Sequence, residues 1–358
     1  MPPLLQQTAL PAAPRPIVCL GAGGIVKTAH LPAYRIAGFS VVSIFDLVPE
    51  KARALADAFH IPRVCSTLSE AIASAPPGAV FDLAVPAPAI LATLQVLPRG
   101  AAVLIQKPLG ETIAEAREIV ALCAERQLTA AVNFQLRYAP NILAARSLIT
   151  QGAIGELHDL EVRVTVFTPW KLWTFLEHAP RVEILYHSIH YVDLIRSFFG
   201  EPQGVQAKTT RHPATPNLAA TRTQLMLDYG DVRRAGIATN HGHDFGRAHQ
   251  ESYVKWEGTR GAIKAGLGVL LNYPAGEPDT LEYCSRDASG PPAWVSVPLE
   301  GAWFPHAFIG PMADVMRFAN GEIAELPTRV ADAFNTMAVV EAAYQSSASG
   351  GVRPEFHP

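Results

Sequence analysis

The sequence predicts two domains, a doubly wound parallel sheet followed by an α/β domain with a large, open, mostly antiparallel sheet. The chain has 358 residues, which suits two cores better than one. Its first third alternates short apolar runs with alanine-rich helical patterns, and the remainder has more strand-like runs than helical ones. We expect a loose N-terminal tail over residues 1–16, one domain over 17–138 and a second over 139–358.

In the first domain, each apolar run has the length of a buried strand and most are followed by a helical pattern. Such alternation produces a parallel sheet with helices on both faces. The predicted strands are residues 17–20, 41–45, 80–85, 103–105 and 128–132, and the predicted helices are residues 49–59, 68–74, 90–97 and 113–125.

The pattern changes after Pro140. One more helix runs to about residue 150, Gly152 and Gly155 follow, and an alternating strand covers residues 157–166. Strands joined by short turns then favour an antiparallel sheet, and we expect the last helices to pack back on the first domain. The other predicted strands are 204–210, 224–227, 235–239 and 252–256, and the predicted helices are 184–199, 307–319 and 330–346.

A glycine turn, Gly21-Ala22-Gly23-Gly24-Ile25, follows the first strand. It lets the backbone approach a pyrophosphate, whose charge meets the amide groups at the start of the next helix. Alone this pattern is weak, because glycine turns are also common for conformational reasons. Asp46 ends the second strand, where an acid binds the ribose hydroxyls and repels a 2′-phosphate. The sequence therefore predicts a Rossmann domain that binds NAD, with NADP disfavoured.

Lys107 comes directly after the fourth predicted strand, and Pro108 prevents the strand from continuing. Ligands of open parallel sheets lie outside the carboxyl ends of the strands. The ammonium group is therefore expected in the cofactor crevice, where it can polarise a substrate hydroxyl. The ordinary alternative is a surface lysine at a strand end.

A second polar group lies in the helix that is predicted over residues 184–199. Tyr186 and His190 are four residues apart and so share a helix face, with His187 beside them. Histidine exchanges protons near neutral pH, so His190 is a candidate general base and Tyr186 a candidate relay. Taken alone, these residues are better explained as partly buried, hydrogen-bonded structural side chains.

Composition excludes several classes of protein. Charged residues make up 17% of the chain and the formal net charge is −3, with no basic stretch for nucleic acid. No segment is long and apolar enough to span a membrane, and residues 1–16 do not resemble a signal peptide. The cysteines lack metal or redox spacing, which suits a reducing cytoplasm. They are Cys19, Cys65, Cys123 and Cys284.

Several motifs occur in order along the chain and together resemble the glucose-fructose oxidoreductase, inositol dehydrogenase and rhizopine-catabolism family of NAD(P)-dependent dehydrogenases. The resemblance covers nearly the whole chain and implies a nucleotide-binding domain, a substrate-binding domain with a large open sheet, and a homodimer or homotetramer. The matching pieces are Gly21-Ala22-Gly23-Gly24-Ile25, His30-Leu31-Pro32-Ala33, Lys107-Pro108-Leu109, Asn133-Phe134-Gln135-Leu136-Arg137-Tyr138, Gly152-Ala153-Ile154-Gly155-Glu156, His190-Tyr191-Val192-Asp193-Leu194 and Gly258-Thr259-Arg260-Gly261-Ala262-Ile263.

The resemblance also implies roles for individual residues. Lys107 matches the family's catalytic lysine and His190 its proton-transfer histidine, while Pro86, Gln106 and Gln135 are expected beside the cofactor. The chain departs from the family at two carboxylates: Gln106 stands where glutamate is usual, and Tyr186 stands where aspartate is usual. Both departures remove negative charge near Lys107 and His190 and lower their proton affinities relative to the family.

By the same resemblance, the substrate cleft is bordered by aromatic and polar side chains of the second domain. The tryptophans are equally expected as anchors of a loop. His187, His241 and His243 have a spacing that allows a metal site, but three uncertain ligands are a thin basis for one, and we expect none. The predicted substrate-binding residues are Lys107, Arg137, Trp170, Trp173, His187, His190, Asn240 and His241.

The sequence thus predicts an NAD-dependent dehydrogenase that oxidises a secondary hydroxyl of a sugar, sugar acid, polyol or glycoside. Lys107 polarises this hydroxyl and His190 accepts its proton. Two alternatives stay open. One is a glycoside-cleaving enzyme that recycles a bound NAD, and the other is a non-catalytic NAD- or sugar-sensing regulator.

Overall fold

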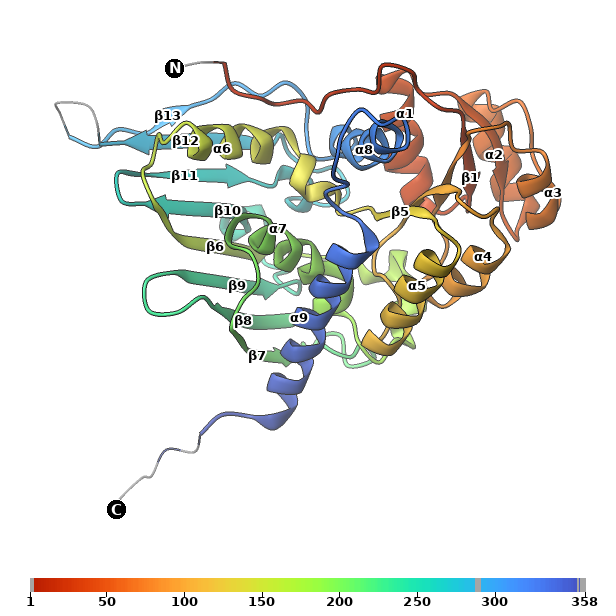
Figure 1. Cartoon of the computed structure of the whole chain (residues 1–358). Coiled ribbons are helices and arrows are strands. Elements are labelled where there is room, and N and C mark those ends of the chain that lie inside the picture. The colour runs from red at the N-terminus through yellow and green to blue at the C-terminus, as the bar shows by residue number, and fades with distance from the viewer. Residues whose placement is uncertain (1–2, 287–290, 353, 355–358) are drawn as a thin grey trace.

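The computed structural model describes residues 3–286, 291–352 and 354. The first domain has a five-stranded sheet of order β2-β1-β3-β4-β5 in which every pair is parallel (Figure 1). The central strands are buried at every position, as expected for a sheet covered on both faces. The strands are β1 (Ile17–Leu20), β2 (Val41–Phe45), β3 (Val80–Leu83), β4 (Ala102–Ile105) and β5 (Thr129–Val132).

Helices connect these strands, and their ends follow capping chemistry. Thr67 and Thr112 accept a hydrogen bond from the backbone three residues later and so begin α3 and α5. Gly38, in the left-handed region, ends α1. The helices of this domain are α1 (Leu31–Ala37), α2 (Pro49–Phe59), α3 (Leu68–Ala73), α4 (Ile90–Val96) and α5 (Ile113–Glu125).

The second domain is built on an eight-stranded sheet of order β13-β12-β11-β10-β6-β9-β8-β7. Only the pairing of β6 with β9 is parallel, so the sheet is mixed and mostly antiparallel, as predicted. The strands are β6 (Leu157–Thr165), β7 (Gly204–Thr210), β8 (Arg222–Asp228), β9 (Arg234–Asn240), β10 (Glu251–Gly258), β11 (Gly261–Gly266), β12 (Thr280–Ser285) and β13 (Val295–Ser296).

The last three strands were not predicted from the sequence. β11 contains two glycines, and β13 has only two residues, so neither carries a readable alternation. They form because β10 offers an unpaired edge, along which β11 pairs from Tyr253–Gly266 to Gly258–Gly261. Pairing therefore overrides weak local propensity here.

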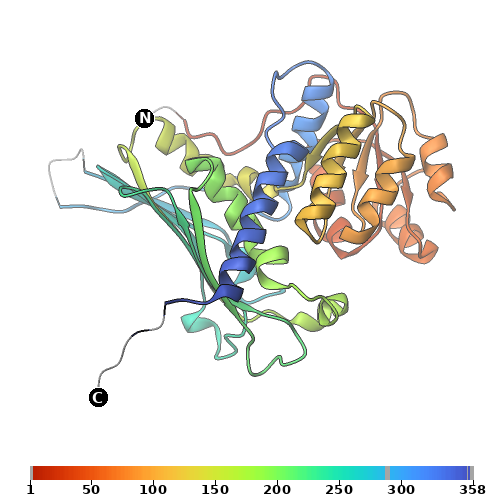
Figure 2. The same ribbon diagram turned by 60° about the horizontal axis from the view of Figure 1, so that its bottom comes forward.

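Helices cover one face of the second sheet, which Figure 2 shows nearly edge-on. The other face has no helix among the described residues and is lined by polar side chains that pair with one another. Tyr253 donates a hydrogen bond to Glu161 at 2.5 Å, and the Arg163 guanidinium lies 2.6 Å from Glu251. The helices are α6 (Pro140–Thr150), α7 (Ile189–Phe199) and α9 (Val330–Ser349).

Segments from both ends of the chain join the two domains. Helix α8 (Ile309–Ala319) packs on β4, β5 and α1, and α9 packs on both α5 and β7 (Figure 1). The segment before β1 is not loose over its described part. The Leu5 amide donates to Ser147, the Gln6 side chain donates to the carbonyl of Pro298, and Arg15 donates to the carbonyl of Ala319. These hydrogen bonds correct the expectation of a loose tail for residues 3–16.

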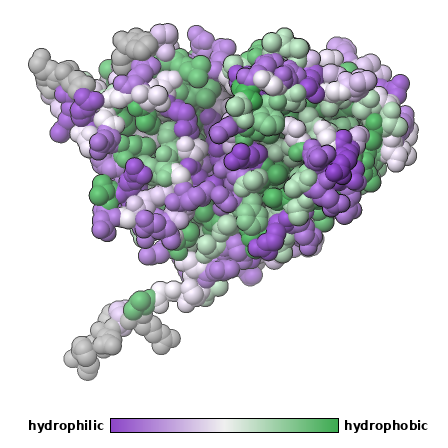
Figure 3. All heavy atoms as spheres, viewed as in Figure 1, coloured by the Kyte–Doolittle hydropathy of each residue, from purple (hydrophilic) through white to green (hydrophobic). Residues whose placement is uncertain are grey.

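On the face shown in Figure 3, hydrophilic and hydrophobic residues are mixed over both domains. Within the described ranges, no helix has both the length and the apolar character needed to cross a membrane. All four cysteines are buried free thiols.

Candidate active site

The predicted cofactor residues all lie at the carboxyl ends of the first domain's strands. Neighbouring β1 and β3 continue to opposite sides of the sheet, to β2 and β4, so a crevice opens above them. The residue ranges place Gly21 after β1, Asp46 after β2, Pro86 after β3 and Gln135 after β5. The fold therefore brings these predicted residues to one edge.

The glycine turn after β1 fits a pyrophosphate. Gly21 has φ of +113°, and a Cβ there would overlap the carbonyl oxygen of Ala84, so only glycine is tolerated. Cβ atoms at Gly23 and Gly24 would meet nothing within 4 Å, which leaves open space above the turn. The chain becomes helical immediately afterwards, and the first amides of a helix have no acceptor within it.

Asp46 is half-buried beside this turn. Its carboxylate accepts one hydrogen bond from the Ala22 amide at 2.7 Å and another from the Val48 amide at 2.8 Å. The carboxylate is therefore held at the β1 turn, with lone pairs left for ribose hydroxyls. The two residues that follow, Leu47 and Val48, carry no positive charge that would attract a 2′-phosphate.

The other cofactor candidates line the same edge. Pro86 is exposed after β3, and the Gln106 side chain accepts a hydrogen bond from the Lys107 amide at 3.0 Å. Gln135 is buried, and its side-chain oxygen has no hydrogen-bond partner in the described structure. A buried polar atom without a partner is uncommon in proteins, and this one is available to a ligand.

Lys107 lies between the two domains. Its ammonium group donates a hydrogen bond to the backbone oxygen of Tyr186 at 2.8 Å, which leaves two N–H donors for other partners. Desolvation by the surrounding protein lowers its pKa to about 8. With Gln106 beside it in place of a glutamate, the ammonium gains no charge compensation from that position.

Tyr186 is arranged differently from the sequence prediction. It lies in a π-helical turn, Ile184–Ser188, which runs directly into α7. The π-turn changes which residues share a face. The hydroxyl of Tyr186 donates to Glu111 at 2.9 Å, and its backbone oxygen binds Lys107. Tyr186 therefore connects this turn to the loop after β4, and its role as a relay to His190 stays a prediction.

His190 is buried at the start of α7, between the rings of Phe134 and Trp303. Its Nδ1 atom has no hydrogen-bond partner in the described structure. Burial, and secondarily the charge of Lys107, lower the pKa of His190 well below its usual value, so the imidazole is neutral.

A cluster of three rings, Trp170, His187 and His241, lies next to these residues; we call it the ring cluster. The centroids of His187 and His241 are 4.6 Å apart, and Trp170 lies at 5.1 Å from the first and 5.5 Å from the second. Burial, and secondarily electrostatic interactions with His241, Lys107 and His190, lower the pKa of His187 well below its usual value. The ring cluster therefore lies within electrostatic range of Lys107 and His190.

The remaining predicted substrate residues are less direct. Trp173 is half-buried and its ring centroid lies 5.7 Å from that of Tyr273. The side chain of Asn240 accepts a hydrogen bond from the Gly242 amide at 3.0 Å, so it shapes the loop that carries His241. The contacts of Trp173 and Asn240 are therefore with other protein groups. Both residues are close in sequence to the ring cluster, since Trp173 follows Trp170 by three residues and Asn240 directly precedes His241.

Arg137 is held by two acidic side chains. Its guanidinium makes two 2.6 Å hydrogen bonds to Asp193 and one of 2.8 Å to Asp332. A further N–H donates to the carbonyl of Pro327. The side chain is thus held in a buried ion-pair network between α7 and α9, and its contact with substrate stays a prediction.

One buried residue was missed in the sequence. Glu183, fully buried before the π-turn, accepts a hydrogen bond from Ser188 at 2.7 Å and lies 3.5 Å from Nε2 of His241. On the other side of that ring, Thr168 is 2.9 Å from Nδ1. The available signal was the Glu183–His187 spacing of four residues, but the π-turn instead brings Glu183 to Ser188, five residues later.

The metal candidates do not form a common set of ligands. His187 and His241 are in contact, but the ring of His243 packs against Phe245. Over the described residues, no group of three or more His, Cys, Asp or Glu side chains is placed to hold a metal ion.

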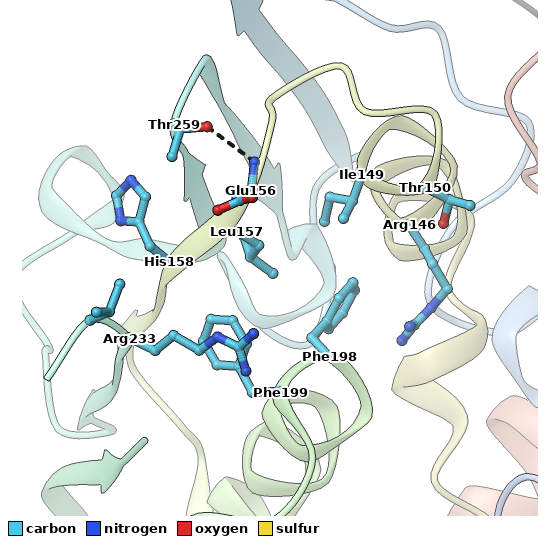
Figure 4. A pocket seen from close by; sticks show the side chains of 11 residues that line it. Arg146, Ile149, Thr150, Glu156, Leu157, His158, Phe198, Phe199, Arg233 and Thr259 are labelled. Atoms are coloured by element: carbon cyan, nitrogen blue, oxygen red, sulfur yellow. Dashed lines mark hydrogen bonds between the residues drawn. The ribbon is translucent and has the colours of Figure 1, made fainter. Parts of the chain in front are cut away.

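A separate cavity of about 780 Å³ lies in the second domain where α6 and α7 end (Figure 4). Arg146 stacks on Phe198 at 3.9 Å and donates to the carbonyl of Ser197, while Arg233 lies over Phe199. The two arginines that line the cavity therefore stabilise the end of α7 and the phenylalanine rings there. None of the predicted site residues lines it, so its size does not identify it as the active site.

Comparison with known proteins identifies the chain. Residues 16–134 match the family profile described as "Oxidoreductase family, NAD-binding Rossmann fold", and residues 142–264 match the "GFO/IDH/MocA C-terminal domain". D-apiose dehydrogenase of Paraburkholderia graminis is 27% identical over 342 residues, which cover 91% of this chain and 86% of that protein. The 1,5-anhydro-D-fructose reductase of Ensifer adhaerens is 26% identical, covering 72% and 77% respectively.

Solved structures share the fold over nearly the whole chain. An oxidoreductase from Agrobacterium radiobacter, in complex with NAD⁺, L-tartaric acid and magnesium, has a TM-score of 0.79 at 20% identity and covers 95% of this chain and 98% of its own. A levoglucosan dehydrogenase in complex with NADH and levoglucosan has a TM-score of 0.75 at 18% identity, covering 94% and 98%. The chain therefore belongs to the Gfo/Idh/MocA family of oxidoreductases and carries that family's NAD-binding Rossmann domain.

Proposed function

We propose that the protein is an NAD-dependent dehydrogenase that oxidises a secondary hydroxyl of a sugar, sugar acid, polyol or glycoside. The observation that carries this proposal is the meeting of Lys107 and His190 beside the cofactor edge. Lys107 binds the backbone of Tyr186, four residues before His190, and its charge contributes to the lowered pKa of His190. A hydrogen-bond donor and a neutral base therefore face one region.

In the proposed reaction, NAD supplies the carbon that accepts a hydride. The protein supplies the groups that activate the alcohol. The two remaining N–H donors of Lys107 bind the hydroxyl oxygen and stabilise the negative charge that develops on it. The neutral imidazole of His190 accepts the hydroxyl proton. Gly21, Gly23, Gly24, Ile25 and Asp46 bind the dinucleotide, with Pro86, Gln106 and Gln135 near the nicotinamide.

A polyhydroxylated substrate is supported by the polar atoms around this region. Nε1 of Trp170, Nδ1 of His190 and Nε2 of His243 are buried and lack partners within the described residues. Hydroxyl groups both donate and accept hydrogen bonds, so one ligand class can satisfy such a mixed set. The sugar-related names of the two curated relatives point to the same class of substrate.

The proposal is tested by NADH formation, followed at 340 nm with NAD supplied, across aldoses, uronic acids, inositols and glycosides. We expect a signal with one substrate class and none in Lys107→Met. The matched control is Lys171→Met, a change at an exposed lysine of the second domain. If the wild-type protein binds NAD but oxidises none of these compounds, the proposal is contradicted. Cleavage of a glycoside without net NADH would instead indicate recycled NAD.

We also propose a homodimer or homotetramer in the cytoplasm. Residues 17–138 are proposed to bind NAD, and residues 139–358 to bind substrate and form the contact between subunits. The face of the second sheet that no described helix covers is the candidate contact, and the buried free thiols suit a reducing compartment. Light scattering of the purified protein measures the mass, and a monomer at working concentration would contradict the oligomer.

A further inference from the structure

Glu183 is a buried carboxylate in an unusual setting. Its side chain is fully buried, and within the described residues His241 is the only basic side chain at ion-pair distance, with Nε2 lying 3.5 Å from the carboxylate. A buried charge is costly unless it is paired and hydrogen-bonded. A group of this kind is expected where it has a role beyond stability.

The carboxylate is one link in a line of polar contacts. Ser188 donates to Glu183, Glu183 faces Nε2 of His241, and Nδ1 of His241 lies 2.9 Å from the hydroxyl of Thr168. His241 then packs on His187 in the ring cluster. In the described structure, neither the second carboxylate oxygen of Glu183 nor Nε2 of His241 has a hydrogen-bond partner, so Glu183 and His241 are in ion-pair contact without a hydrogen bond.

The carboxylate is ionised. Burial raises the pKa of Glu183, but the nearby His241 imidazole and the hydroxyls of Thr223 and Ser188 outweigh this effect and hold the pKa below its usual value. Tyr191 and Tyr344 also face it, because its charge contributes to their raised pKa values. The negative charge is therefore present throughout the neutral pH range.

Positions 106 and 186 supply no such charge in this chain. Gln106 is neutral, Tyr186 is turned toward Glu111, and Nδ1 of His190 lacks a carboxylate. The region of Lys107, His187 and His190 is consequently rich in groups that bind protons and poor in direct negative charge. Glu183 lies next to this region, within ion-pair distance of His241.

We propose that Glu183 is a positioning residue that acts through His241 on the ring cluster and supplies the negative charge missing at positions 106 and 186. This inference rests on the proposed dehydrogenase function. When the substrate O–H bond breaks, its proton passes to an imidazole, while the hydride and its electron pair leave the carbon for NAD. The Glu183 carboxylate offsets the positive charge that then accumulates beside Lys107.

The test compares Glu183→Gln with wild type in the intact, NAD-loaded protein. We expect kcat to fall about 10- to 100-fold, the effect of removing one charge that favours the transition state through a neighbouring ring. Removing a negative charge also lowers proton affinity nearby, so the acidic limb of the kcat/KM profile should move to lower pH. NAD affinity should not change. A wild-type kcat and pH profile in this variant would overturn the inference.

Three variants separate charge from folding. Glu183→Asp keeps the charge and should recover the wild-type acidic limb, though not the full kcat. Ser188→Ala keeps the carboxylate, removes one of its donors and should leave that limb in place. Glu341→Gln removes a carboxylate of α9 that pairs with Arg181, and it should change neither quantity. If Glu183→Gln does not fold, Glu183→Asp and Ser188→Ala decide the question, because both keep the carboxylate charge. An acidic limb that is shifted in both of them would overturn the inference.

Histidine ¹⁵N spectra without substrate distinguish this inference from the dehydrogenase proposal. If Glu183 acts through His241, Glu183→Gln should change the His241 and His187 resonances and leave that of a distant residue, His60, unchanged. Unchanged His241 and His187 resonances would overturn the inference even if the wild type oxidises a sugar. Changed resonances in a protein that oxidises nothing would leave the contact intact and remove only the dehydrogenase proposal.

Discussion

At the carboxyl edge of the first sheet, every candidate residue follows its own strand within five positions, as Lys107 follows β4 and Gln135 follows β5. The ring cluster is assembled differently. Trp170 comes from a 3₁₀ turn, His187 from a π-turn and His241 from the end of β9, more than fifty residues further along the chain. Strand order brings the first group together, whereas tertiary packing alone brings together the second. The difference suggests that cofactor binding is local in the sequence and that substrate chemistry is not.

The largest expected effect comes from Lys107→Met. Loss of its two N–H donors should lower kcat by about 10³-fold, as for removal of a preorganised donor at a developing oxyanion. NAD affinity should stay within a few-fold of wild type, because the glycine turn and Asp46 are untouched. Stopped-flow hydride transfer and NAD titration measure the two quantities separately. Normal hydride transfer would remove Lys107 from the chemistry of this edge.

Arg137→Ala should act on stability instead. The guanidinium is 13% exposed and pairs with Asp193, which is 1% exposed, so the variant leaves a buried charge without its partner. The expected loss is about 3–5 kcal/mol of unfolding free energy. Urea unfolding followed by fluorescence measures it. An unchanged urea midpoint with a raised KM would mean that Arg137 contacts substrate after all.

The pH profile relates the two regions to each other. If Lys107 acts as an ammonium donor, kcat/KM should fall about tenfold per pH unit above its pKa of about 8. His190 must be neutral to accept a proton, and its lowered pKa puts the acidic limb below pH 6.5. A rate profile from pH 5 to 10 shows both limbs. An activity that rises through pH 8 would instead assign the base to Lys107.

The smallest effect is expected for Tyr186→Phe. This change removes the hydrogen bond to Glu111 but keeps the backbone oxygen that binds Lys107. A loss of about 1 kcal/mol in stability is typical for one such bond, and we expect kcat to fall only a few-fold. Glu111→Gln is the matched variant from the other side of the bond. A hundredfold loss of kcat in Tyr186→Phe alone would support Tyr186 as a proton relay.

Sequence patterns were sufficient where the chain is locally consistent. β1, β2, β7, α2 and α5 have the predicted bounds, because short apolar runs and Thr or Pro helix starts specify them directly. Asp46 and Lys107 were found for the same reason. The strands β11 to β13, the contacts of the N-terminal segment and the ion pairs of Arg137 depend on partners far along the chain, which no local pattern reveals.

By itself, the sequence determined a parallel sheet with a dinucleotide edge, an acid suited to NAD and a lysine at the end of β4. It did so because a parallel strand places whatever follows it at one edge of the sheet. Only the tertiary structure decided that Tyr186 faces Glu111, that Nδ1 of His190 lacks a partner and that Glu183 lies beside His241. A π-turn changes which side chains share a helix face, and that geometry cannot be read from residue spacing.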